Sequence, residues 1–229
     1  MFAYIPARSG SKRILNKNIK KIGSKPIISY VIDNLKKLHF IKGIIVSTDS
    51  NKIKNICEKE GALCYDLRKK DLSNDSANFI DLIKNDIPRY QEKFENDNNL
   101  LFVLATAALV DKKTFEKAYK IYLKKKPEVL IPCKKYSVNP YMSMFLNKKK
   151  YLQSLFPKKI LLNSQNLNDL YYDAGLFYFM DISKIRKLNS IKNSKKILPF
   201  VVTDQDGIDI DTMDDWNKFK DIFNKGTNN

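Results

Sequence analysis

The chain has 229 residues, of which 43% are hydrophobic. That share is enough to fill a core, so it excludes a disordered chain, and the length suits one domain spanning residues 1–229. No apolar stretch is long enough to cross a bilayer, and the first residues lack the basic start and long apolar centre of a signal peptide. We therefore expect a soluble cytoplasmic protein with no membrane partner.

The formal net charge is +17, which is typical of nucleic-acid binders. The lysine runs, however, fall at expected helix ends and turns, and no repeated platform of aromatic and arginine side chains accompanies them. We interpret most lysines as solvated surface and expect no nucleic-acid partner, although the positive field favours small polyanions such as nucleotides. A basic RNA-binding protein without catalytic activity is the alternative from another class. Three cysteines and one histidine, His39, are too few for a disulfide framework or a zinc site.

Short apolar segments alternate with segments of helical spacing through the first part of the chain. Strands are expected at 2–6, 41–47, 62–66, 100–105 and 129–133. Helices are expected from Pro26 to Leu38, from a cap at Asp49 or Ser50 to Gly61, over 77–94 with a kink or end at Pro88, and over 111–124. Apolar strands separated by helices predict a parallel sheet covered on both faces. The fold class is therefore α/β, a doubly wound, mostly parallel, Rossmann-like sheet of the mononucleotide-binding type.

The alternation breaks near residue 136. The segments 141–146 and 151–156 predict a hairpin with a basic turn, and an irregular, Asn-rich stretch follows over 157–170. Strands are expected again at 176–180 and 200–203, and a closing helix at 212–224. We interpret 136–170 as an insertion that projects from the core and pairs with a second subunit, which predicts a homodimer.

The loop after the first strand carries the strongest functional signal. It combines Gly10 and two hydroxyls with four cations, Arg8, Lys12, Arg13 and Lys17. Open α/β sheets bind ligands just after the strands, where backbone N–H groups and cations can wrap a triphosphate. The loop lacks the spacing of a Walker A motif. The alternative is an ordinary basic surface loop.

A second signal is the segment GIDIDT at 207–212. Alternation places Asp209 and Asp211 on the same face of an extended segment. Two converging carboxylates repel each other unless a cation lies between them, and Mg²⁺ takes one or two carboxylates together with substrate phosphates. The alternative is that Asp211 caps the helix starting at Thr212 and that Asp209 is merely exposed.

Two further polar segments give weaker signals. Ser47-Thr48-Asp49 ends a buried strand on the same edge as the first loop, and Asp49 is expected to act as a helix N-cap. Asp173-Ala174-Gly175, with Ser164-Gln165 upstream, places polar groups beside apolar structure, where they can contact hydroxyls and amides of a ligand.

Taken together, these segments resemble the CMP-sialic acid synthetase family, the cytidylyltransferases that activate nonulosonic acids. The matching pieces, in order, are 5–12 with 17–18, 45–49, Arg68 with Asp75, Thr106, and 208–212. The chain is most similar to the CMP-pseudaminic acid synthetase group, through Ala105-Thr106-Ala107, Ser164-Gln165 and Asp173-Ala174-Gly175-Leu176-Phe177-Tyr178. It departs from that group mostly in the sugar half, at 108–109, 139–142, Asn163 and Asn166.

The resemblance implies a fold of the nucleotide-diphospho-sugar transferase type, a Mg²⁺ cofactor and a homodimer. It also implies that CTP reacts with a nonulosonic acid, pseudaminic acid first of all, to give the CMP-sugar and pyrophosphate for surface glycans or flagellin. The alternatives are a CMP-N-acetylneuraminate or CMP-legionaminate synthetase, and a paralogue that binds nucleotide without turnover. The implied catalytic residues are Arg8, Lys17 and Asp211. Those implied for CTP are Ala7, Arg8, Ser11, Lys12, Asn18, Arg68 and Ala77. Those implied for the sugar are Thr106, Gln165 and Asp173, and those for the metal are Asp209 and Asp211.

Overall fold

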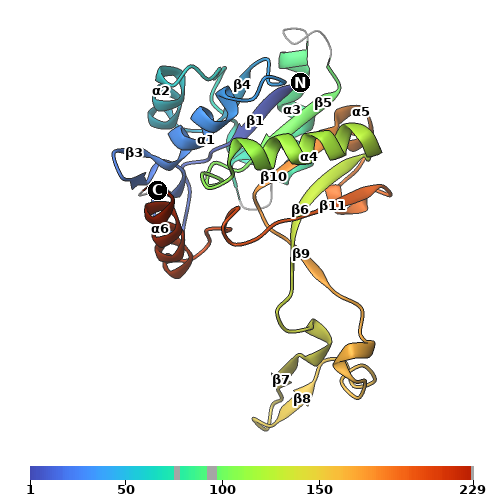
Figure 1. The fold of residues 1–229 in the computed structure, drawn as a ribbon. Helices are drawn as coiled ribbons and strands as arrows, with labels where there is room; N and C mark the ends of the chain where they lie inside the picture. Colours follow the sequence, from blue (N-terminus) through green and yellow to red (C-terminus); the bar gives the residue numbers. More distant parts are fainter. Residues whose placement is uncertain (75–77, 92–96, 228–229) are drawn as a thin grey trace.

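The structure is a computed structural model that describes residues 1–74, 78–91 and 97–227. Its main strands are β1 (Phe2–Pro6), β4 (Ile44–Ser47), β5 (Asn99–Val103), β6 (Val129–Lys135), β9 (Tyr171–Asp173), β10 (Phe177–Asp181) and β11 (Ile197–Val201). Its helices are α1 (Ile27–Lys36), α2 (Asn51–Lys59), α3 (Phe79–Gln91), α4 (Lys112–Lys125), α5 (Ile182–Ile185) and α6 (Met213–Thr227). In this part of the chain seven strands form one sheet, in the order β11-β6-β10-β5-β1-β4 with β9 beside β6 (Figure 1).

The sheet is mixed but mostly parallel. β1 runs parallel to β4 and β5, and β11 runs parallel to β6, whereas β10 is antiparallel to both β5 and β6. The reversal has a local cause, because the chain leaves the sheet after β6 and returns through β9, which pairs antiparallel with the end of β6. The expectation of a Rossmann-like, mostly parallel α/β sheet is confirmed, and the direction of β10 is the detail that the sequence pattern missed.

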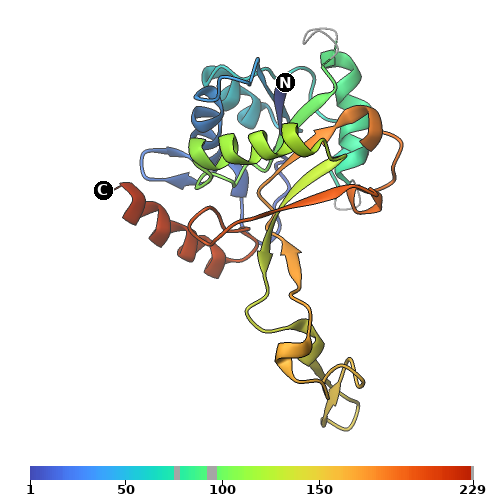
Figure 2. The same cartoon turned by 45° about the vertical axis from the view of Figure 1, so that its right-hand side comes forward.

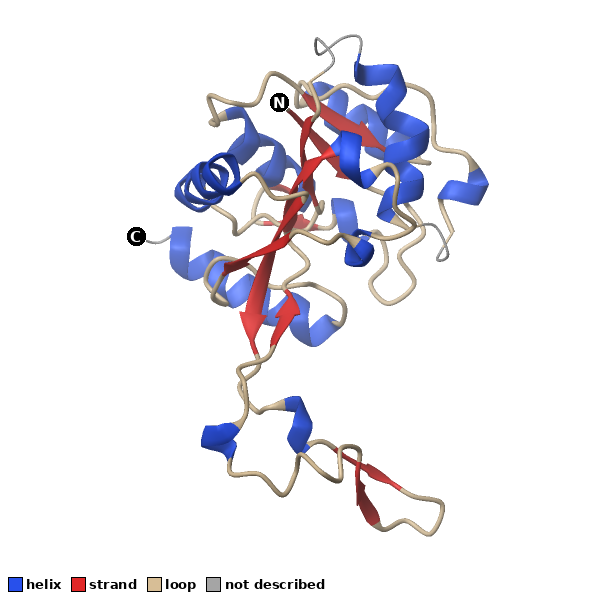
Figure 3. Cartoon of the chain, turned by 90° about the vertical axis from the view of Figure 1, so that its right-hand side faces the viewer, coloured by secondary structure: helices blue, strands red, loops and turns tan. Residues whose placement is uncertain are grey.

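Alternating side chains of the central strands pack into two separate hydrophobic cores. In β1, Phe2 and Tyr4 pack on one face, while Ala3 and Ile5 pack on the other, as the two-residue period of a strand requires. Buried side chains of α1, α2, α4 and α6 belong to the core with Ala3, and those of α3 and α5 belong to the core with Phe2. Helices therefore cover both faces of the sheet, which runs through the middle of the molecule in Figure 3.

The order of the strands creates a crevice at one edge of the sheet. The chain passes from β1 to β4 on one side and then returns to β5 on the other side of β1. At such a reversal the loops after neighbouring strands diverge, and the space between them is where open α/β sheets bind ligands. The loop after β1 and the loop after β5 are therefore expected to border a site.

Residues 136–170 form an arm that extends away from the body of the protein (Figures 1 and 2). It leaves β6, carries the hairpin of β7 (Met144–Leu146) and β8 (Leu152–Ser154), and returns in β9. The projecting hairpin agrees with the sequence expectation, while its part in pairing subunits stays a prediction. No helix in the described ranges is long and apolar enough to cross a membrane.

One local expectation was wrong, and a second was wrong in one of its two alternatives. The segment 62–66 makes only a single bridge, between Ile45 and Leu63, instead of a strand. Pro88 lies inside α3, which continues to Gln91, so the helix does not end there, and the alternative of a kink stays a prediction. Proline removes one helical hydrogen bond, but the neighbouring Ile83 and Ile87 are fully buried in the core around Phe2, and this packing holds the helix together.

Candidate active site

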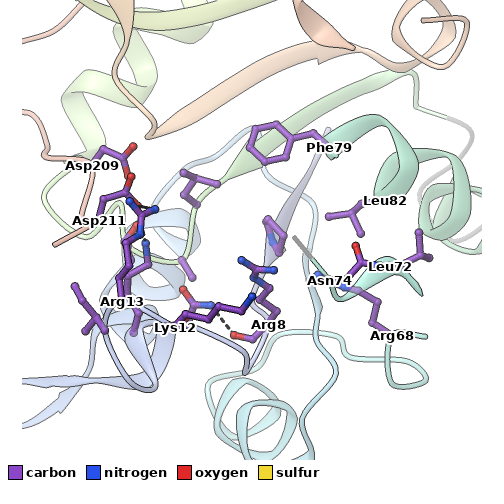
Figure 4. Close-up of a pocket in the computed structure, with 18 residues that line it drawn as sticks. Arg8, Lys12, Arg13, Arg68, Leu72, Asn74, Phe79, Leu82, Asp209 and Asp211 are labelled. Atoms are coloured by element: carbon purple, nitrogen blue, oxygen red, sulfur yellow. Dashed lines mark hydrogen bonds and ion pairs between the residues drawn. The ribbon is translucent and has the colours of Figure 1, made fainter. Parts of the chain in front are cut away.

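The cationic loop after β1 and the acidic pair before α6 lie on the walls of one cavity. The cavity has a volume of about 350 Å³. Its lining includes, from the loop, Arg8, Ser11, Lys12, Arg13, Lys17 and Asn18, and from the acidic segment Asp209 and Asp211. Figure 4 shows Asp209 and Asp211 on one side of the cavity and Arg68, Leu72 and Leu82 on the other. The two charged segments therefore border one cavity, and they also touch each other, with Arg13 beside Asp211.

Direct contacts join the loop to Asp211. Arg13 Nη2 lies 2.8 Å from Asp211 Oδ1, and Lys17 Nζ lies 3.5 Å from the same oxygen. Lys17 Nζ also donates a hydrogen bond to the carbonyl oxygen of Ile210. Because the side chains of Arg13 and Asp211 are 66% and 41% exposed, water screens this ion pair, and a charged ligand can replace it at little cost.

Two side chains fix the path of the loop through hydrogen bonds with its backbone. Asn18 donates from its amide nitrogen to the carbonyl oxygen of Arg8, at 2.9 Å. Asp49 accepts from the backbone N–H of Ser9 at 2.7 Å and from its hydroxyl at 3.1 Å. The expected role of Asp49 as the cap of α2 was wrong, because Ser50 is the residue whose side chain accepts from the N–H of Ile53. β1 and β4 are parallel neighbours, so Asp49 emerges beside the loop.

Arg68 is held at the edge of the cavity by the end of β4. Its Nε donates to the hydroxyl of Ser47 at 3.0 Å, and its Nη2 donates to the carbonyl oxygen of Ser47 at 2.5 Å. Arg68 lines the cavity next to Leu72 and Asn74. Ala77, which is also implied for CTP, and Asp75 lie outside the described residues.

Asp209 and Asp211 form an acidic pair that faces the cavity. Partial desolvation and then the charge of Asp211 raise the pKa of Asp209 to about 6. Gly175 makes room for this carboxylate, since a Cβ there would lie 2.6 Å from Asp209 Oδ2. The alternative that Asp211 caps α6 was wrong, although Asp209 is exposed, as that alternative expected. The Thr212 hydroxyl accepts from the N–H of Asp215, whose carboxylate accepts in return from the N–H and hydroxyl of Thr212.

This pair fits a divalent cation of the hard, oxygen-binding type. Within the described ranges no group of three or more His, Cys, Asp or Glu side chains is placed to hold a metal. The protein ligands available in the cavity are therefore the carboxylates of Asp209 and Asp211. Mg²⁺ is commonly bound by one or two carboxylates plus substrate phosphates and water. A cation between Asp209 and Asp211 would also relieve the repulsion that raises the pKa of Asp209.

The residues implied for the sugar are not brought together. Thr106 is buried and lines the cavity at the end of β5. Gln165 belongs to the short helix Ser164–Asn166 in the arm and does not line the cavity of its own chain. Asp173 accepts from the hydroxyl of Tyr178 at 2.8 Å and from the N–H of Gly175 at 2.9 Å, so it organises the entry to β10 rather than lining the cavity.

Ala7, which the resemblance implies for CTP, does not present its side chain to the cavity, and its contact with the nucleotide stays a prediction. Its side chain is fully buried, and its N–H donates to the carbonyl oxygen of Ser47 at 2.9 Å, which continues the pairing of β1 with β4. It is not among the residues that line the cavity. The first residue of the loop therefore belongs to the sheet, and the ligand-facing part starts at Arg8.

One wall of the cavity is apolar, and the sequence pattern did not predict it. Leu72, Phe79, Leu82 and Leu104 line the cavity beside the charged residues. The Phe79 ring stacks obliquely against Phe102, with centroids 4.5 Å apart. The helical spacing of 79–87 assigns Phe79 and Leu82 to the core, and only the position of α3 at the crevice makes them line a site. The cavity thus has a charged wall suited to phosphates and an apolar wall suited to a base or a sugar substituent.

Comparisons with known proteins agree with this geometry. The family model described as cytidylyltransferase matches residues 2–186. The chain is 31% identical to the pseudaminic acid cytidylyltransferase of Campylobacter jejuni subsp. jejuni serotype O:2 over 76% of this chain and 75% of that protein. It is 26% identical to the CMP-N,N'-diacetyllegionaminic acid synthase of Legionella pneumophila over 94% of this chain and 93% of that protein.

The fold has solved counterparts as well. A structure of CMP:2-keto-3-deoxy-manno-octonic acid synthetase complexed with CTP matches with a TM-score of 0.70, covering 98% of both chains at 15% identity. At that identity the likeness supports the Rossmann-like fold. The family model and the relatives show that the chain belongs to the cytidylyltransferase family, the CTP-dependent nucleotidyltransferases.

Proposed function

We propose that this protein transfers CMP from CTP to a nonulosonic acid, pseudaminic acid in the first place, and releases pyrophosphate. The observation that carries the proposal is the cavity between the cationic loop and the acidic pair, which offers both signs of charge to one metal–triphosphate. The relatives named as pseudaminic acid cytidylyltransferases support the choice of sugar.

The reaction is an in-line displacement at the α-phosphorus of CTP. The oxygen of the sugar's anomeric hydroxyl forms a bond to this phosphorus, the bond between the α-phosphorus and the bridging oxygen breaks, and the pyrophosphate leaves with that oxygen. The hydroxyl proton passes to water. Such transfers need little covalent participation from the protein, so positioning and charge stabilisation provide most of the rate.

The position of each residue in the cavity assigns it to one part of the substrates. Arg8 donates to the oxygens around the α-phosphorus, where charge develops, and Lys12 and Lys17 hold the departing pyrophosphate. Ser11 and Asn18 border the phosphates, Arg68 borders the cytidine, and Thr106 lies where the sugar approaches. Asp209 and Asp211 would hold Mg²⁺, which when bound neutralises phosphate charge and lowers the pKa of the attacking hydroxyl.

The sugar preference can be measured directly by pyrophosphate release. With CTP and Mg²⁺, we expect kcat/KM for pseudaminic acid to exceed that for N-acetylneuraminic and legionaminic acids by about tenfold or more, because one mismatched substituent in a shaped pocket costs that much. Equal values for the three sugars, or a preference for legionaminic acid, would reassign the substrate within the family. CTP without sugar is the control, and ATP, GTP and UTP test the nucleotide.

The proposal includes a homodimer in which each arm completes the partner's sugar site. An isolated two-stranded hairpin has little stability of its own, and this one carries several large exposed apolar side chains. They include Met144, Phe145, Leu146, Tyr151 and Leu152. A second copy of the chain would cover them, and it would bring Gln165, which is remote from its own cavity, to a neighbouring one.

A charge on the hairpin is expected to separate the subunits. Leu146 and Leu152 lie opposite each other across the β7–β8 pair, and their side chains are 66% and 69% exposed. We expect the wild type to elute as a dimer at micromolar concentration, and Leu152→Glu to elute as a monomer with an increased KM for the sugar. Leu123→Glu, a like change at an exposed position of α4, is the control and should remain dimeric. A monomeric wild type contradicts the dimer.

A further inference from the structure

A buried lysine outside the cavity lining contacts the segment that precedes the acidic pair. Lys134, near the end of β6, is 8% exposed, and among the buried side chains of the described ranges it is the one lysine or arginine. Its Nζ donates to Asp204 Oδ1 at 2.6 Å and to the carbonyl oxygen of Gly207 at 2.7 Å. Burying an ammonium group is costly, so these two contacts are needed to hold it there.

Both partners of Lys134 belong to the segment that connects β11 to Asp209. Asp204 lies three residues after β11, and Gly207 precedes Asp209 by two residues. Residues 204–207 belong to no strand or helix, so the shape of this stretch depends on individual contacts. The ammonium group of Lys134 joins the two ends of the stretch 204–207 and fastens them to the sheet.

Close packing leaves the segment little room to shift. A Cβ at Gly207 would lie 2.6 Å from Leu176 Cδ2, and a Cβ at Gly175 would lie 2.6 Å from Asp209 Oδ2. Asp206 adds a second fastening, because it accepts from the N–H and hydroxyl of Thr203 and from the hydroxyl of Thr114 on α4. A displacement of Gly207 would therefore be passed directly to Asp209.

We propose that Lys134 is a positioning residue that sets the carboxylate of Asp209 for metal binding, by holding Asp204 and the carbonyl group of Gly207. The inference rests on the proposed function, since it assigns the metal to Asp209 and Asp211. Lys134 does not line the cavity and acts through the segment 204–209. A purely stabilising lysine would lower the melting temperature when replaced, without changing the affinity for metal.

The test measures metal binding rather than turnover. Mn²⁺ is titrated into the protein with CTP and without sugar, and the unbound ion is followed by electron paramagnetic resonance. Lys134→Met keeps the length of the side chain and removes its charge. We expect it to weaken Mn²⁺ binding by about tenfold, the usual effect of losing a group that orients a metal ligand.

Lys135→Met is the matched control. Lys135 is the next residue on β6, and it makes an ion pair at 2.7 Å with Asp169 in the arm, away from the acidic pair. The Lys135→Met variant should bind Mn²⁺ as the wild type does.

A second variant, Asp204→Ala, tests the same role if Lys134→Met does not fold. Asp204 is exposed, and its loss leaves Lys134 hydrogen-bonded to the carbonyl oxygen of Gly207. We expect Asp204→Ala to weaken Mn²⁺ binding by about threefold.

The outcomes separate this inference from the proposed function. If the wild type and the folded Lys134→Met variant bind Mn²⁺ with CTP equally well, Lys134 has no positioning role and the proposed function stands. Unchanged binding by Asp204→Ala, when it is the deciding variant, has the same meaning. If the wild type itself binds no Mn²⁺ with CTP, the metal assignment is overturned, and the role of Lys134 with it.

Discussion

Replacing Asp211 with alanine is expected to abolish turnover and to leave the protein folded. Asp211 faces the cavity beside Asp209 and contacts Arg13 and Lys17 of the cationic loop. Without its carboxylate, one of the two proposed metal donors is lost, and Mg²⁺ no longer offsets the phosphate charge. We expect pyrophosphate release at saturating CTP, sugar and Mg²⁺ to fall by more than about 10³-fold.

The fold should survive because Asp211 carries little of the structure. The start of α6 is capped by Thr212 and Asp215, and both remain in the variant. The Arg13–Asp211 ion pair is exposed, and such pairs contribute between about 0 and 1 kcal/mol to stability. Asp214→Ala is the control, an exposed carboxylate in the first turn of α6, and should keep wild-type turnover. A folded Asp211→Ala variant with near-normal Mg²⁺-dependent rates would remove Asp211 from the metal site.

The alternation of strands and helices could be read from the sequence because it depends on local patterns. The buried strands of a doubly covered sheet are apolar throughout, and the helices between them show one apolar face. The direction of β10 could not be read in this way. It follows from the antiparallel return of the chain through β9, and an apolar run such as 177–180 has the same pattern in either direction.

The site was predictable where residues act at strand ends and less so where they act at a distance. Parallel strands bring their carboxyl ends to one edge, which predicted that the loop with Arg8 borders a site, and Thr106, implied by the resemblance alone, lines the same cavity. Asp49, by contrast, holds Ser9 across the β1–β4 pair, a contact between residues forty positions apart that a capping pattern concealed. Gln165 shows another limit, because a family motif in the arm does not indicate which cavity it serves, and its contact with the sugar stays a prediction.

Replacing Arg8 with alanine has the second-largest expected effect. Arg8 is the first residue of the loop to line the cavity, and Asn18 fixes its backbone through a hydrogen bond to its carbonyl oxygen. The guanidinium group itself donates from Nη1 to the carbonyl oxygen of Ser73 at 3.4 Å, a long contact that it can exchange for phosphate oxygens, where it would stabilise the developing charge. Its loss should reduce kcat by about 10²–10³-fold, the usual effect of removing one such donor.

Arg8→Lys separates charge from geometry, and Arg89→Ala controls for the loss of an arginine elsewhere. Lysine keeps the charge but lacks the planar fork of donors, so its rate should fall between those of the wild type and Arg8→Ala. Arg89 lies on α3 and pairs with Asp66 outside the cavity, and its variant should turn over normally. Because the interaction is made with the transition state, kcat should fall while KM for CTP changes little. A decrease in kcat of less than about threefold for Arg8→Ala, or one confined to KM, would mean that Arg8 binds nucleotide without stabilising the transition state.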